Sequence, residues 1–172
     1  MPSNIEIKAR INGDARSVRA RARKLATQAP TIMRQEDTFF VTPRGRLKLR
    51  VPDHGVAELI YYERADEIGP RSSTYAVAAV EDPSALKEVL TACLGIRGVV
   101  RKERELFLAG DTRIHVDDVE GLGLFLELEV ALPGEDRREA VRRRCRELMD
   151  ALGVGDEDLV DRAYIDLLIA RG

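Results

Sequence analysis

The sequence of 172 residues contains no tryptophan, two histidines and two cysteines, and aromatic residues make up only 5% of it. The cysteines are not in a paired metal-ligand spacing and the two histidines are isolated, which argues against a structural zinc site. Free cysteine is among the most buried residue types. We therefore expect Cys93 and Cys145 to be reduced core residues, each on the apolar side of a helix.

Long apolar segments are also missing. No run approaches the length that spans a bilayer, and residues 1–4 lack the basic and apolar regions of a signal peptide. The formal net charge of −2 argues against a broad basic surface for nucleic acid. We accordingly expect a cytoplasmic protein with no membrane and no nucleic-acid partner.

Three common motifs of nucleotide and hydrolase chemistry are absent. The chain has no G-x-x-x-x-G-K-[ST] loop and no G-x-S-x-G segment, and Gly121-Leu122-Gly123 lacks the third glycine of a dinucleotide fingerprint. Any phosphate chemistry must therefore depend on side chains rather than on a glycine-rich loop.

The length and composition of the chain fit one folded domain over residues 1–172, since 44% of the residues are hydrophobic and 34% are charged. Alternation and turn residues predict strands at 4–10, 36–42, 46–51, 56–64, 72–80, 99–108, 112–119 and 124–132. Helical spacing predicts helices from Asp14 to before Pro30, from Asp82 to Gly95, at 135–152 and at 157–170. Short turns join most strands, so the fold class is α+β with an antiparallel sheet.

Charged side chains alternate with apolar ones along five of these strands. Side chains two positions apart share a face, so Glu6, Lys8 and Arg10 lie together on one face of the first strand. Similar faces on later strands carry Arg46, Lys48, Arg50, Lys102, Arg104, Arg113, His115, Asp117, Glu127 and Glu129. If the sheet curls with these faces inward, it encloses a channel lined by cations and carboxylates.

The simpler alternative is an open sheet whose charged face meets water. Two features favour the channel. The faces are almost purely ionic, with little Ser, Thr or Gln, and Lys8, Lys48 and Lys102 place three of the five lysines of the chain on them. An enclosed surplus of cations must be solvated, paired internally or matched by a counter-charged ligand, because unpaired buried charge costs several kcal/mol per ion. Clustered carboxylates suit Mg²⁺ or Mn²⁺ and the cations suit phosphate oxygens, so a polyphosphate bound with metal fits the set.

Three segments make the sequence resemble the CYTH family of triphosphate tunnel metalloenzymes. Residues 4–8, Asn-Ile-Glu-Ile-Lys, match an E-x-E-x-K strand at its second glutamate and its lysine, and residues 125–129, Phe-Leu-Glu-Leu-Glu, match a late strand with paired glutamates. The ending Ala-Tyr-Ile-Asp-Leu-Leu at 163–168 also resembles family members. The likeness extends over nearly the whole chain.

The resemblance implies a closed eight-stranded antiparallel β-barrel, or tunnel, with a charged interior and helices packed outside. It implies that Mg²⁺ or Mn²⁺ is held by Glu6, Asp117, Glu127 and Glu129. It implies that a triphosphate is bound by Lys8, Arg10, Lys48, Arg50, Arg64, Lys102, Arg104 and Arg113. Lys8 is also the candidate to orient or deprotonate the attacking group, since a lysine among cations can have a lowered pKa.

The chain departs from the family pattern at two places. Asn4 replaces the first glutamate of the motif, which leaves open whether one or two metal ions bind. Glu63 stands near a position where the family often has lysine, and the sequence does not decide whether Glu63 or its neighbour Arg64 faces the tunnel.

Four functions remain open at this point. The resemblance favours metal-dependent hydrolysis of a triphosphate, either inorganic, nucleoside or thiamine triphosphate. A class IV adenylyl cyclase, which makes cyclic AMP and pyrophosphate from ATP, would use the same tunnel. The others are a non-catalytic polyphosphate- or nucleotide-binding module and a purely structural protein. The resemblance alone suggests a homodimer.

Overall fold

The computed structural model describes residues 1–64 and 66–171, and its elements follow the order that the sequence predicts. They are β1 (Ser3–Arg10), α1 (Arg16–Leu25), β2 (Thr31–Phe40), β3 (Arg46–Pro52), β4 (Ala57–Arg64), β5 (Arg71–Val80), α2 (Pro83–Leu94), β6 (Ile96–Ala109), β7 (Thr112–Val119), β8 (Gly123–Ala131), α3 (Arg138–Leu152) and α4 (Tyr164–Ile169). Short 3₁₀ turns occupy Glu135–Arg137 and Asp156–Asp158.

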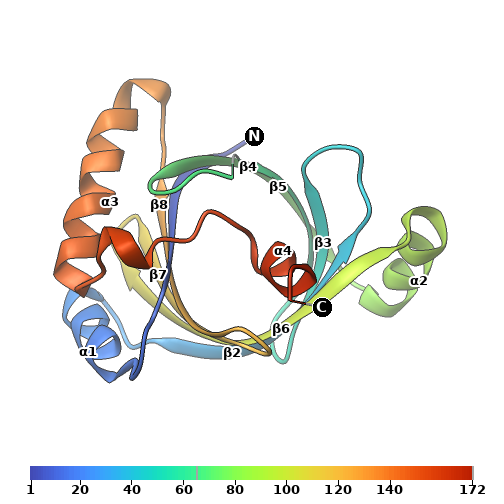
Figure 1. Ribbon diagram of the computed structural model, residues 1–172. Helices are drawn as coiled ribbons and strands as arrows, with labels where there is room; N and C mark the ends of the chain where they lie inside the picture. The colour runs from blue at the N-terminus through green and yellow to red at the C-terminus, as the bar shows by residue number, and fades with distance from the viewer. Residues whose placement is uncertain (65, 172) are drawn as a thin grey trace.

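The eight strands form a closed antiparallel barrel in the order β1-β5-β4-β3-β2-β6-β7-β8 (Figure 1). β1 closes it by pairing with β8 along Asn4–Arg10 and with β5 along Ser3–Glu6. Side chains alternate between the inside and the outside of the barrel. The expected closed barrel with a charged interior is thus confirmed. β2 begins five residues earlier than the expected strand, because it pairs with β6 as far as Leu106.

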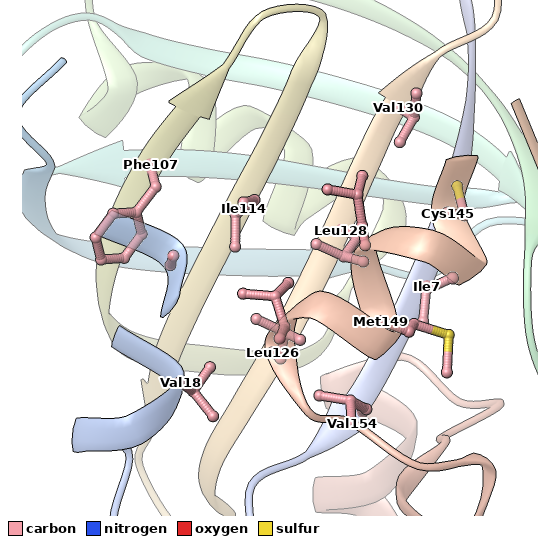
Figure 2. Packing of buried hydrophobic residues seen from close by; sticks show 14 of the residues in the cluster. Ile7, Val18, Phe107, Ile114, Leu126, Leu128, Val130, Cys145, Met149 and Val154 are labelled. Atoms are coloured by element: carbon pink, nitrogen blue, oxygen red, sulfur yellow. The ribbon is translucent and has the colours of Figure 1, made fainter. Parts of the chain in front are cut away.

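The main hydrophobic core lies outside the barrel wall. Outward-facing residues of β1, β6, β7 and β8 pack against α1 and α3, as Figure 2 shows for Ile7, Leu128 and Met149. The apolar stripe predicted for α3 is buried here, including Cys145 and Leu148. Because the core lies outside the wall, the interior of the barrel is free for polar groups. None of the helices in the described part of the chain has the length and apolar character needed to cross a membrane.

The last predicted helix begins later than expected. Residues 159–163 are not helical: Leu159 forms a bridge with Ala9, and the Val160 N–H donates to the Lys8 carbonyl at 2.9 Å. This part of β1 lies beyond the stretch that pairs with β5, so its edge is free to accept another chain segment. Arg71 fixes the segment by donating from Nη1 to the carbonyls of Val160 and Asp161. The apolar residues of 159–163 have helical spacing, but they lie in an extended segment.

One core prediction is wrong. Cys145 is fully buried, as expected, but Cys93 on α2 is exposed. Within the described residues α2 buries none of its side chains, and Val89 on its apolar stripe is 57% exposed. A stripe at helical spacing shows which side of a helix is apolar, but it does not show that another element covers it.

Leu148→Ala should lower the free energy of unfolding by about 2–5 kcal/mol, because the leucine is 1% exposed within the packed core. Val89→Ala on α2 is the control, and we expect it to change stability by less than about 0.5 kcal/mol. Urea unfolding of both variants measures the difference. Equal effects of the two substitutions would show that the core does not lie between α3 and the barrel.

Candidate active site

The barrel encloses a cavity of about 360 Å³ whose wall is strongly ionic. The pleat of each strand points every second side chain inward, which places the charged faces of the sequence inside. Seven basic side chains line the cavity: Lys8, Lys48, Arg50, Arg64, Lys102, Arg104 and Arg113. Five acidic side chains lie among them: Glu6, Asp37, Glu58, Glu127 and Glu129. The cavity wall therefore has a formal surplus of two positive charges.

The barrel brings together every predicted site residue except Arg10 and Asp117. Arg10 does not line the cavity: its guanidinium lies 4.7 Å from the centre of the Phe125 ring and donates to the Leu122 carbonyl. Between Glu63 and Arg64, the inward residue is Arg64, which donates to Glu6 at 3.1 Å. The Nε and Nη2 groups of Arg64 are buried without a hydrogen-bond partner among the described residues. These two donors can bind an anion.

Asp117 lies behind the cavity wall and orients a cation. It is fully buried, and its oxygens accept from Arg104 Nε at 2.7 Å, from Arg104 Nη2 and from the Tyr164 hydroxyl at 2.9 Å. Burial would raise the pKa of Asp117, but Arg104 outweighs it and lowers the pKa. Since both oxygens are engaged, the arrangement suits positioning of Arg104 better than the metal binding that the resemblance implies.

The main residue that sequence reasoning missed is Asp37. It is 2% exposed and accepts from Lys48 Nζ at 2.9 Å, from Arg50 Nε at 2.8 Å and from Lys102 Nζ at 3.4 Å. Burial opposes its charge, but these cations together hold its pKa well below 3.8. Asp37 therefore anchors three phosphate-contact candidates on two strands. Its signal in the sequence is weak, because no second charge lies beside it on the inward face of β2.

Burial makes the interior lysines easier to deprotonate than free lysine. Desolvation lowers the pKa of Lys8 to about 8, although Glu127 lies 2.9 Å from its Nζ. Desolvation and the nearby Arg50 lower the pKa of Lys48 to about 7. Burial and Arg104 also lower the pKa of Lys102. A bound anion would favour the charged form of all three.

α4 lies at the opening of the barrel (Figure 1), where Ala163 and Tyr164 line the cavity. Its first residue, Tyr164, is buried, with Lys8 Nζ 3.5 Å from the centre of its ring. Asp166 on the same helix pairs with Arg46 at 2.7 Å and with Arg97 at 2.6 Å, from the starts of β3 and β6. These contacts hold the aromatic ring of Tyr164 over the lysine-rich end of the cavity.

A group of acceptors inside the barrel has the composition of a cation site. One ligand atom each from His115, Glu127 and Glu129 lies within 4.8 Å of the others, and Glu6 is the cross-strand neighbour of Glu129. Burial and the charges of Glu6 and Glu127 raise the pKa of Glu129. Its contact with Arg113 is long, with 3.6 Å between Arg113 Nη1 and Glu129 Oε2. Crowded carboxylate oxygens of this kind fit a hard divalent cation.

Asp37→Asn should destabilise the protein by about 3–5 kcal/mol at neutral pH, because it leaves buried cations without their counter-charge. The pKa of Asp37 is depressed in the folded state, so its contribution is complete above the ordinary value of 3.8 and is lost as the pH falls through the folded value. The free energies of unfolding of Asp37→Asn and of the unsubstituted protein, measured with urea, should therefore come closer together below pH 3.8. Asp118→Asn, on the exposed face of β7, is the control. A pH-independent difference would contradict this role.

Known proteins share the sequence pattern and the fold of this chain. A CYTH domain profile matches residues 3–164. The "Putative adenylate cyclase MJ0240" of Methanocaldococcus jannaschii is 28% identical over 95% of this chain and 97% of its own. The PH1012 protein of Pyrococcus horikoshii has the same fold, with a TM-score of 0.84 and 25% identity over 95% of this chain and 98% of that one. A Hippeastrum protein, described as a "putative adenylyl cyclase" with a dominant triphosphatase activity, has the same fold, with a TM-score of 0.63 and 17% identity over 98% of this chain and 95% of that one. The chain belongs to the CYTH domain family.

Proposed function

We propose that this protein is a metal-dependent enzyme that acts on a triphosphate and hydrolyses its terminal phosphate. The observation that carries the proposal is the enclosed cavity with seven basic and five acidic side chains. Its small positive surplus does not neutralise a triphosphate alone, whereas a divalent cation held by the carboxylates makes up the difference. Catalysis of phosphoryl transfer depends mainly on such positioning and charge neutralisation.

The phosphate contacts come from two strands, β3 and β6, that flank β2 on one side of the barrel. Lys48 and Arg50 on β3 and Lys102 and Arg104 on β6 face the same space. Asp37 between the two strands and Asp117 behind Arg104 fix their positions. The Nε and Nη2 groups of Arg64, which have no hydrogen-bond partner within residues 1–64 and 66–171, add further donors. Arginine offers a planar fork to phosphate oxygens and lysine a compact charge, so the set can hold several phosphates in line.

Mg²⁺ or Mn²⁺ would be held by Glu6, Glu127 and Glu129, with His115 beside them. The ion would neutralise charge on the phosphate oxygens during transfer. Glu127 is tied to Lys8 and Arg104, and Glu6 to Arg64, which leaves Glu129 the carboxylate with the weakest protein contacts. We therefore assign Glu129 as the first ligand.

Lys8 is the residue we assign to the attacking water. It lies at the end of the cavity beneath Tyr164, and burial lowers its pKa to about 8. Its Nζ can hold the water oxygen toward the terminal phosphorus. Attack forms the new P–O bond while the bridging P–O bond breaks, and the products are phosphate and diphosphate when inorganic triphosphate is the substrate.

Adenylyl cyclase activity is the second candidate, and the name of the Methanocaldococcus jannaschii relative favours it. In that reaction the 3′-hydroxyl oxygen of ATP attacks the α-phosphorus and pyrophosphate leaves. The same cations would hold the phosphates, but the reacting phosphorus would be at the other end of the chain of phosphates.

Incubation of the purified protein with inorganic triphosphate, ATP and thiamine triphosphate, each with Mg²⁺ or Mn²⁺, tests the proposal. We expect phosphate release that stops when the metal is chelated. Cyclic AMP with pyrophosphate from ATP would establish the cyclase instead. Thermal stabilisation by triphosphate without any product would establish a binding module. The absence of both binding and turnover would refute a triphosphate site.

Glu129→Gln in the same assay should lower turnover at limiting metal by more than about tenfold, with partial recovery at high metal concentration. Glu139→Gln on the exposed side of α3 is the matched control. Full turnover by Lys8→Ala would contradict the role assigned to Lys8.

Binding of inorganic triphosphate at pH 8 should take up protons. Lys48 has a pKa of about 7 in the free protein and is mainly neutral at this pH, whereas a phosphate beside it favours the charged form. Calorimetry in buffers of different ionisation enthalpy measures the number of protons. Lys48→Arg, which is always charged, should bind with an uptake that is lower by up to about one proton. The same uptake in both proteins would show that Lys48 does not contact the ligand.

A further inference from the structure

Arg71 is a buried cation outside the set assigned to substrate and metal. It is the first residue of β5, is 1% exposed and is the cross-strand neighbour of Glu6, yet it does not line the ionic cavity. Its Nε and Nη2 groups have no hydrogen-bond partner in the described parts of the chain. Burial, with Arg64 nearby, lowers its pKa to about 10, so the guanidinium is still charged at neutral pH. A buried charge with so few partners destabilises a fold, so stability alone does not account for it.

The contacts that Arg71 makes are with the backbone. Its Nη1 donates to the carbonyls of Val160 at 3.0 Å and Asp161 at 2.9 Å, both in the extended segment 159–163. The same nitrogen donates to the Glu67 carbonyl at 2.8 Å, in the loop before β5. Hydrogen bonds from a charged donor are stronger than neutral ones. Arg71 therefore fastens segment 159–163 to the end of the barrel.

Segment 159–163 in turn holds Lys8 at two places. The Val160 N–H donates to the Lys8 carbonyl at 2.9 Å, on the part of β1 that extends beyond its pairing with β5. The segment leads directly into Tyr164, and the centre of that ring lies 3.5 Å from Lys8 Nζ. Both the backbone and the ammonium group of Lys8 thus contact residues whose position depends on Arg71.

The cations on β3 and β6 are held in a different way. Asp37 fixes three of them by ion pairs that do not involve segment 159–163: Lys48, Arg50 and Lys102. The position of Lys8 can therefore change while these phosphate contacts keep theirs.

We propose that Arg71 is a positioning residue, which acts through segment 159–163 to hold Lys8 in place for the attacking water. The inference rests on the proposed function, which assigns Lys8 to that water. A displacement of about 1 Å in a reacting group can cost on the order of 10²-fold in rate. Loss of Arg71 should therefore lower kcat much more than it weakens the binding of triphosphate.

Turnover of inorganic triphosphate by Arg71→Met at saturating Mg²⁺ or Mn²⁺ tests the inference. We expect kcat to fall by more than about tenfold and KM to change by less than about threefold. Arg71→Lys should recover part of the loss, because an ammonium group also donates to carbonyl oxygens. Arg21→Met is the matched control: Arg21 donates to the Leu152 carbonyl outside the barrel, and its loss should leave kcat unchanged.

A second substitution at Lys8 separates positioning from general damage to the fold. In a Lys8→Ala background, Arg71→Met should lower the remaining turnover by less than about twofold, because the group through which Arg71 acts is already gone. The same large loss in both backgrounds would overturn the inference. Unchanged kcat in a folded Arg71→Met protein would also overturn it and would leave the proposed function standing.

Amide hydrogen exchange provides a readout that needs no turnover. The Val160 N–H should exchange more than about tenfold faster in Arg71→Met than in the unsubstituted protein, while the amides of β3 keep their protection. If Arg71→Met does not fold, Arg71→Lys takes its place, with a smaller change in the same direction. Equal protection of Val160 in variant and unsubstituted protein would overturn the inference. If the unsubstituted protein turns over no triphosphate, the proposed function fails and the inference with it.

Discussion

The structure depends on keeping many ionic side chains inside a closed barrel. Each buried charge costs several kcal/mol unless it is paired or meets a ligand of opposite charge. The protein meets this cost in part with its own carboxylates: Asp37 serves Lys48, Arg50 and Lys102, and Asp117 serves Arg104. The compensation is incomplete: two nitrogens of Arg64 have no partner in the part of the chain that the structure describes, and burial lowers the pKa of Lys48. An anionic ligand bound in the barrel would supply the counter-charge that the protein itself does not provide.

The hydrophobic core lies outside the barrel, so it stabilises the fold without occupying the ionic interior. The outward faces of β1, β7 and β8 carry Ile7, Ile114 and Leu128, which pack with α1 and α3 into a core outside the barrel. Stability thus comes from one side of the strands and chemistry from the other, with the period-two alternation of the strands separating them. α4 joins the two, since Ile165 packs on the second apolar cluster while Tyr164 faces Lys8.

Alternation predicted the strands and most of the cavity wall, because it fixes which side chains of a strand share a face. The closed barrel was predicted by the resemblance to the CYTH family. It could not predict contacts between strands that are distant in the chain. Asp37 is one carboxylate in a mixed strand until pairing of β2 with β3 and β6 sets it beside Arg50 and Lys102. Arg10 follows the alternation but lies past the end of the cavity, against Phe125. Residues 159–163 have helical spacing, yet the free edge of β1 takes them as an extended segment.

A crystal structure with Mn²⁺ and a non-hydrolysable triphosphate analogue tests the central claim most directly, because the anomalous signal of manganese locates the ion independently of the model phases. We expect manganese between Glu127 and Glu129 and phosphates against Lys48, Arg50 and Arg104, inside the barrel. Manganese and phosphates bound only on the outer surface, with the interior pairs of Asp37 and Asp117 unchanged, would contradict it.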